Sequence, residues 1–161
     1  MYYDIVSHIC IFDGNVLNQI DADKQMINQC RFEIMRSDYK ILIVDDDPMN
    51  IDILMDDLEE LYTLRSAESG EEALQIIPEF HPDLILLDIM MSGIDGYEVC
   101  RRIRADEHYN SIKIILISGR AMENERQKGF AVGADDYVTK PFEVEELVEK
   151  IRILDNDRKG D

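Results

Sequence analysis

Residues 40–48 read Lys-Ile-Leu-Ile-Val-Asp-Asp-Asp-Pro, an aliphatic run that ends directly in three acidic residues and a proline. An apolar run of this length is typical of a strand buried on both faces of a parallel sheet. Asp47 followed by Pro48 predicts a helix start, with the aspartate as N-cap and the proline at the first helical position. This stretch therefore predicts a strand, an acidic turn and a helix in immediate succession.

The same alternation continues along the chain. Further strands are predicted at 62–66, 84–87, 112–117 and 137–138, and helices near 51–61, 73–80, 96–104, 122–132 and 144–154. Strict alternation predicts an α/β fold, a doubly wound five-stranded parallel sheet with five helices on its two faces. Because right-handed crossovers place every loop that follows a strand at one edge of the sheet, residues just after the strands should meet there.

Four of the five predicted strands are followed by residues that can carry chemistry, namely Asp45 with Asp46, then Asp88, Ser118 and Lys140. Carboxylates that meet without a cation repel one another, and a set of oxygen ligands without histidine or thiolate selects a hard ion such as Mg²⁺. A carboxylate beside such an ion can attack phosphorus and form an acyl phosphate, provided that cations and hydroxyl donors balance the charge. The lysine and the serine supply these groups.

Simpler explanations exist for single residues of this set. Ser118 alone would merely end a strand, and Lys140 alone would be a solvated surface lysine. Asp47 is interpreted as a helix cap rather than a metal ligand. Asp88 differs, since nothing local requires an acid after a fully apolar strand, and the coincidence of all the positions favours a functional site.

Residues from Lys40 to about Leu154 resemble the receiver domain of bacterial two-component response regulators, whose fold is similar to that of chemotaxis regulators. The resemblance implies a strand order of 2-1-3-4-5. It is carried by four stretches that span the domain, at 41–48, 86–96, 114–119 and 133–142.

By this resemblance Asp88 would be the phosphoacceptor. Asp45 and Asp46 would hold Mg²⁺ together with Asp88, and the backbone carbonyl of Met90 would complete the metal site. The family's phosphoryl donor is a phosphohistidine on a sensor histidine kinase or a phosphotransfer protein, and small acyl phosphates can replace it. The resemblance thus implies a phosphorylation-activated regulatory domain rather than an enzyme.

The resemblance also implies a switch. Ser118 and Lys140 would grip the phosphoryl oxygens, and the inward movement of Ser118 would let Tyr137 change rotamer. The face formed by the fourth helix, fifth strand and fifth helix would then repack for a downstream protein or output domain. The Lys140-Pro141 bond is a candidate cis peptide. Ser92 departs from the family, which usually has proline at this position.

The composition restricts partners and location. The 161 residues include 35 acidic and 17 basic side chains, a formal net charge of −18, which disfavours direct contact with nucleic acid or an anionic membrane. The three cysteines form no C-x-x-C pair and no run approaches a membrane span, so we expect a cytoplasmic protein.

Three segments are predicted along the chain. Residues 1–38 form an extension with one amphipathic helix from about Asn15 to Arg36, residues 39–154 form the receiver domain, and residues 155–161 form a charged, frayed tail. Two questions stay open at this point. One is whether the protein forms a homodimer through the extension or the output face, and the other is whether it is a stand-alone receiver or part of a longer regulator.

The sequence leaves two alternatives to the receiver open. A haloacid-dehalogenase-type phosphatase would use Asp45 as nucleophile, with Asp47, Ser118 and Lys140 in supporting roles. Against it, Pro48 starts a helix where that superfamily inserts a flap. A receiver-like interaction module that is not phosphorylated is the other alternative, and the intact set of acidic, hydroxyl and lysine residues argues against it.

Overall fold

The computed structural model describes residues 3–4, 9–12, 15–16, 38–119 and 123–159. The chain divides into two compact units, residues 1–35 and residues 36–161. Each unit has a sheet of its own, and the larger unit contains all the candidate site residues named above.

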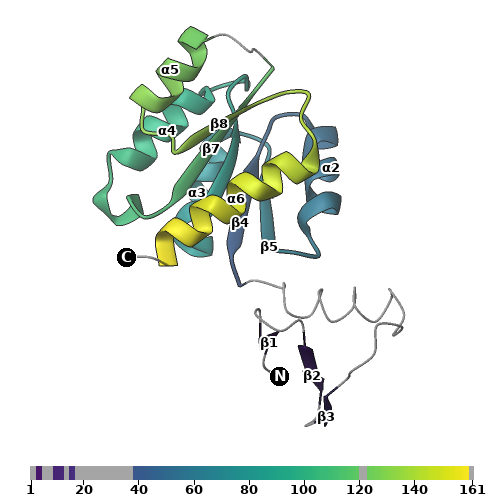
Figure 1. Cartoon of the computed structure of the whole chain (residues 1–161). Coiled ribbons are helices and arrows are strands. Elements are labelled where there is room, and N and C mark those ends of the chain that lie inside the picture. Colours follow the sequence, from purple (N-terminus) through teal and green to yellow (C-terminus); the bar gives the residue numbers. More distant parts are fainter. Residues whose placement is uncertain (1–2, 5–8, 13–14, 17–37, 120–122, 160–161) are drawn as a thin grey trace. The chain divides into compact units, whose positions relative to one another are not determined.

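A five-stranded parallel sheet forms the centre of the larger unit (Figure 1). Its strands lie in the order β5-β4-β6-β7-β8, so the first strand along the chain pairs with the second and the third. This confirms the predicted fold class and the strand order 2-1-3-4-5. The strand bounds are β4, Lys40–Val44; β5, Thr63–Ala67; β6, Leu84–Asp88; β7, Lys113–Ser118; and β8, Asp136–Thr139.

Five α-helices follow the strands and cover both faces of the sheet (Figure 1). Buried side chains of α2 and α6 belong to one core cluster, and those of α3 and α4 belong to a second cluster on the opposite face. The helix bounds are α2, Pro48–Leu58; α3, Gly70–Phe80; α4, Gly96–Arg104; α5, Glu123–Ala131; and α6, Val144–Lys159. A short 3₁₀ helix, η1, spans Glu107–Tyr109.

The central strand β6 explains why the apolar run is uninterrupted. All five of its residues are buried, because Leu84 and Leu86 face the cluster of α2 and α6 while Ile85 and Leu87 face the cluster of α3 and α4. A strand covered on both faces needs apolar residues at every position. The last residue, Asp88, breaks the apolar run at the edge where the loops gather.

The predicted helix start at Asp47 and Pro48 is confirmed. The side chain of Asp47 accepts a hydrogen bond from the backbone N–H of Met49 at 3.0 Å, and Pro48 begins α2. Ser69 caps α3 in the same way by accepting the N–H of Glu72 at 3.2 Å. The Lys140-Pro141 peptide bond is cis, as predicted.

The N-terminal unit differs from the prediction over the residues that the structure describes. Three short antiparallel strands, β1 (Tyr3–Asp4), β2 (Ile9–Phe12) and β3 (Asn15–Val16), form a sheet in sequence order. The predicted helix is wrong at Asn15 and Val16, and its remainder lies outside the described residues. Phe12 pairs with Asn15, and the two residues between them are Asp-Gly, the dipeptide typical of a tight hairpin.

At the other end, α6 extends five residues beyond the predicted limit at Leu154. Leu154 is the last apolar residue of the predicted helix face. Charged residues can continue a helix until a glycine or proline interrupts it, and the first glycine or proline after Leu154 is Gly160. Within the described ranges, no helix combines the length and apolarity needed to cross a bilayer.

Burial on both faces makes β6 sensitive to truncation. We expect Leu86→Ala to lower the free energy of unfolding by about 2–5 kcal/mol, since the cavity would lie between two packed layers. Urea unfolding followed by circular dichroism measures this. Ile153→Ala, at a side chain of α6 that is 52% exposed, is the control and should change the value by less than about 1 kcal/mol. Equal effects of the two substitutions would contradict the packing described for β6.

Candidate functional site

The sheet register brings two acidic residues together. Val44 pairs with Leu87 in the parallel ladder between β4 and β6, so the next residues, Asp45 and Asp88, emerge side by side. Both are almost fully buried, with 4% and 5% of their surface exposed. Asp46 follows in the same loop, and one carboxylate oxygen from each of the three residues lies within 4.8 Å of the other two. The predicted convergence of carboxylates is therefore present.

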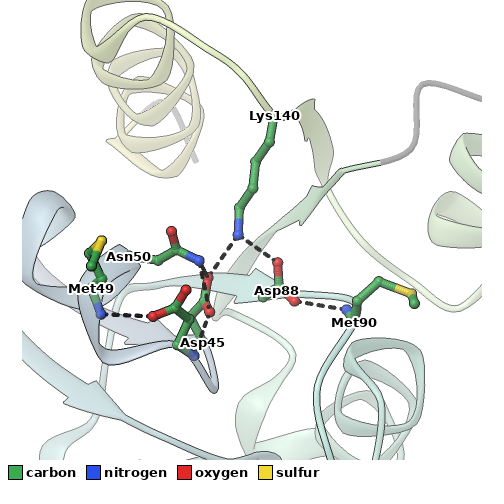
Figure 2. A network of polar contacts seen from close by, with 7 residues as sticks. Asp45, Met49, Asn50, Asp88, Met90 and Lys140 are labelled. Carbon is green, nitrogen blue, oxygen red and sulfur yellow. Dashed lines mark hydrogen bonds and ion pairs between the residues drawn. The ribbon is translucent and has the colours of Figure 1, made fainter.

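Lys140 lies over this cluster and comes from the loop that follows β8 (Figure 2). Its Nζ donates to Asp45 Oδ2 at 2.8 Å and to Asp88 Oδ1 at 2.9 Å, so one ammonium bridges the carboxylates of two strands. Three carboxylates and one ammonium leave two negative charges at the site. A divalent cation would neutralise that remainder.

Backbone and amide donors fix the three carboxylates. Asp45 receives the side-chain amide of Asn50, at 3.2 Å to Oδ1 and 3.1 Å to Oδ2 (Figure 2), and the N–H of Asp47 at 2.9 Å. In the loop after β6, the N–H of Ser92 donates to Asp46 Oδ2 at 2.7 Å. Such donors hold the charged oxygens in place and offset part of their mutual repulsion.

Asp88 is held from its own loop and from α4. The N–H of Met90 donates to Asp88 Oδ2 at 2.8 Å, whereas the Met90 side chain points away from the cluster (Figure 2) and is 56% exposed. Gly96 begins α4 against the backbone of Asp88, where an added Cβ would lie 2.4 Å from the Asp88 carbonyl oxygen. Only glycine lets the helix start this close to the acidic residue.

The electrostatics of the site are set by burial and by the lysine. Burial raises the pKa of Asp88, and the hydrogen bond and charge of Lys140 oppose this only in part. Burial alone would lower the pKa of Lys140, but hydrogen bonds and charges from Asp45 and Asp88 outweigh it, so that this pKa is raised. The lysine therefore stays protonated and acts as a fixed positive charge.

The cluster fits a magnesium ion. Its donors are carboxylate oxygens without imidazole or thiolate, which is the donor set that hard divalent ions prefer. The two uncompensated charges and the close approach of the three oxygens suit one small cation. Asp45, Asp46 and Asp88 are the residues that would hold it.

The two predicted switch residues lie on neighbouring strands. Ser118 is the last residue of β7, and its carbonyl accepts the N–H of Lys140 at 2.7 Å; the residue is 1% exposed. Tyr137 lies in β8 and is 6% exposed. An added Cβ at Gly129 would lie 3.4 Å from the Tyr137 ring, so α5 packs directly against this tyrosine.

Asn50 and Gly96 contribute to the site but were not identified in the sequence. Asn50 lies one turn into α2, on the side of the helix that faces Asp45, and its place after the Asp47 cap was the signal that could have indicated it. Gly96 follows Asp95, which caps α4 by accepting the N–H of Glu98 at 2.8 Å. The role of Gly96 depends on its packing against Asp88 rather than on a local pattern.

A doubly wound parallel sheet with an acidic cluster at the carboxyl ends of its strands defines a flavodoxin-like α/β domain, the class in which ligands bind at this edge. A model of the family described as "Response regulator receiver domain" matches residues 41–152. The chain belongs to this family, and it is a receiver domain of two-component signalling.

Known proteins agree with this assignment. The DNA-binding dual master transcriptional regulator RpaA of Synechocystis is 39% identical over 116 residues, which are 71% of this chain and 48% of RpaA. The chain thus spans about half the length of that relative.

Solved structures agree as well. A crystal structure of a chain assigned as a response regulator from Chloroflexus aurantiacus is 37% identical and covers 73% of this chain and 98% of that chain, with a TM-score of 0.70. The BeF3-activated DrrB receiver domain is 32% identical and covers 73% and 97%, with a TM-score of 0.66. Membership of the family favours the receiver over the phosphatase and the unphosphorylated module.

The raised pKa of Asp88 gives a pH-dependent stability. Its protonated form contributes stability that is fully present below the ordinary value of 3.8 and is lost as the pH rises through the higher folded-state pKa. In EDTA we expect Asp88→Asn to gain stability relative to the wild type as the pH rises from acidic to neutral, and then to hold that gain. Urea unfolding at a series of pH values measures it.

Asp52→Asn, on the exposed side of α2, controls for the change in net charge. A stability of Asp88→Asn relative to the wild type that falls, or does not change, as the pH rises would contradict this account of the buried carboxylate.

Proposed function

We propose that Asp88 is the residue that accepts the phosphoryl group, from a phosphohistidine on a sensor histidine kinase or phosphotransfer protein. One Asp88 oxygen would form a bond to phosphorus while the bond from phosphorus to the donor breaks, and the electron pair would leave with the donor's imidazole nitrogen. The observation that carries this proposal is the bridge from Lys140 to Asp45 and Asp88, at 2.8 and 2.9 Å.

The other hydrogen bonds at the cluster support Asp88 over Asp45 as the nucleophile. Asp45 accepts three further hydrogen bonds, two from the side chain of Asn50 and one from the N–H of Asp47, so its oxygens are already held. Asp88 accepts only the Met90 N–H besides the lysine among the hydrogen bonds described here. Its raised pKa indicates a carboxylate that is poorly stabilised as an anion, which favours reaction with an electrophile.

We assign Mg²⁺ as the cofactor, held by Asp45, Asp46 and Asp88 and by the backbone carbonyl of Met90. When bound, the ion supplies positive charge to the phosphoryl oxygens. Lys140 would hold a second phosphoryl oxygen, because its ammonium already lies 2.9 Å from Asp88 Oδ1. The hydroxyl of Ser118, at the end of the neighbouring strand, would donate to a third.

We infer that the phosphoryl group on Asp88 is read through Ser118 and Tyr137. Movement of Ser118 toward the phosphoryl group would free space beside Tyr137, which packs against α5 at Gly129. The surface of α5, β8 and α6 would then change, and a downstream protein or output domain would bind it in one state. The domain acts as a regulatory element rather than an enzyme, in the cytoplasm, without direct contact to nucleic acid or membrane.

Labelling by a small acyl phosphate tests the proposal. Acetyl phosphate with Mg²⁺ should add one phosphoryl group to the protein, as measured by intact mass, because the donor needs no partner surface. We expect no addition in EDTA and none to Asp88→Asn.

Asp47→Asn is the matched control, since Asp47 is an exposed acid of the same edge that caps α2, and asparagine retains a capping oxygen. This variant should be labelled like the wild type. Labelling that persists in Asp88→Asn would refute the assignment. Turnover of a generic phosphate ester that survives in Asp88→Asn would instead favour the phosphatase alternative.

A further inference from the structure

Helix α5 is held to the domain by few apolar contacts. Across its residues 123–131, all of which are described, Gly129 is the buried position, whereas α4 buries five of its nine residues. Phe130 is 42% exposed. Since burial of an amphipathic face supplies most of the stability of a protein helix, α5 must depend on other contacts for its position.

One such contact comes from Tyr97 of α4. This tyrosine is 2% exposed, and its hydroxyl lies 2.6 Å from Glu125 Oε2 and 3.1 Å from the Glu125 backbone carbonyl. The short bond to the carboxylate is charge-assisted and is stronger than a bond between neutral groups. Lys128 Nζ also lies 4.0 Å from the centre of the Tyr97 ring, so two residues of α5 hold one aromatic side chain.

Tyr97 connects this contact to the phosphorylation site. It directly follows Gly96, which packs against the backbone of Asp88, and the Gly96 N–H donates to the Ile89 carbonyl at 3.1 Å. The other buried residues of α4, including Val99 and Ile103, fix this helix firmly to the sheet. The tyrosine hydroxyl is therefore a fixed point against which the position of α5 is set.

Space is available beside the contact. An open cavity of about 490 Å³ is lined by Tyr97, Glu125 and Lys128 and also by residues of the site edge that include Asp46 and Ser92. Such a cavity can admit water to the tyrosine hydroxyl and the carboxylate once they separate. Breaking the bond therefore does not leave a buried polar group without a partner, which suits a reversible contact.

We propose that Tyr97 is a positioning residue whose hydrogen bond to Glu125 holds α5 in the resting state, and that activation of the domain requires this bond to break. The inference rests on the proposed phosphorylation of Asp88 and adds a restraint on α5 that is separate from Ser118 and Tyr137. Removing the restraint should shift the population toward the activated state before any phosphoryl group is bound.

The test uses the full chain with Mg²⁺ and beryllofluoride, a phosphoryl mimic. Tyr97→Phe removes only the hydroxyl and keeps the ring, and Glu125→Gln removes the charge. Each should tighten the apparent binding of beryllofluoride by about three- to tenfold, the range expected when one hydrogen bond of the resting state is lost. The double variant should gain little beyond Tyr97→Phe alone, since both substitutions act on the same bond, which Tyr97→Phe removes and Glu125→Gln weakens.

Glu123→Gln is the matched control, an exposed glutamate in the same first turn of α5, and it should bind beryllofluoride like the wild type. Structural damage alone would weaken the binding of beryllofluoride. Unchanged or weaker binding by Tyr97→Phe would therefore overturn the proposed restraint on α5. In that case, binding by the wild type would still support the proposed function. If the wild type binds no beryllofluoride, the proposed function fails and the inference fails with it.

Amide hydrogen exchange examines the restraint without any phosphoryl mimic. In Tyr97→Phe we expect faster exchange in α5 and unchanged exchange in α4, since only α5 loses an anchor. Equal exchange of α5 in the variant and the wild type would show that the bond does not hold this helix, and would overturn the inference even if the phosphorylation site is correct.

Discussion

The repulsion among three carboxylates at one edge of the sheet is the constraint on which this domain is built. The parallel register forces Asp45 and Asp88 together, because the strands that carry them are neighbours and both are covered by helices. Lys140, in the loop that follows the edge strand β8, neutralises part of the charge. The remaining negative charge is the physical reason why this edge suits a divalent cation.

The same constraint explains how stability is traded for reactivity. Burial raises the pKa of Asp88, so the ionised form of this residue destabilises the folded domain, and the proposed function uses this same carboxylate for bond formation. The two strands that lead to the cluster, β4 and β6, are apolar apart from Lys40 and Asp88, and the N-terminal caps of α2, α3 and α4 accept hydrogen bonds. The rest of the fold therefore offsets this local loss of stability. Helix α5, with few buried contacts, is the element free to respond.

The sequence predicts those features that depend on local pattern and on the handedness of crossovers. The five strands, the Asp47 cap and the residues at the strand ends follow from runs of apolar residues and from the single edge that parallel strands share. The strand at Asn15 and Val16 was not predicted, because apolar residues at helical spacing from Leu17 onward favoured a helix from about Asn15. The bond from Tyr97 to Glu125 joins positions 28 residues apart and depends on side-chain rotamers, which no periodicity encodes.

Chemical trapping of the phosphorylated residue tests the central claim most directly. Borohydride reduces an acyl phosphate to an alcohol, so an aspartyl phosphate formed with acetyl phosphate and Mg²⁺ becomes homoserine at the modified position. Peptide mass mapping should find homoserine at position 88 and aspartate at positions 45 and 46. Homoserine at position 45 would contradict the account. So would a protein that carries phosphate but shows no homoserine at positions 45, 46 and 88.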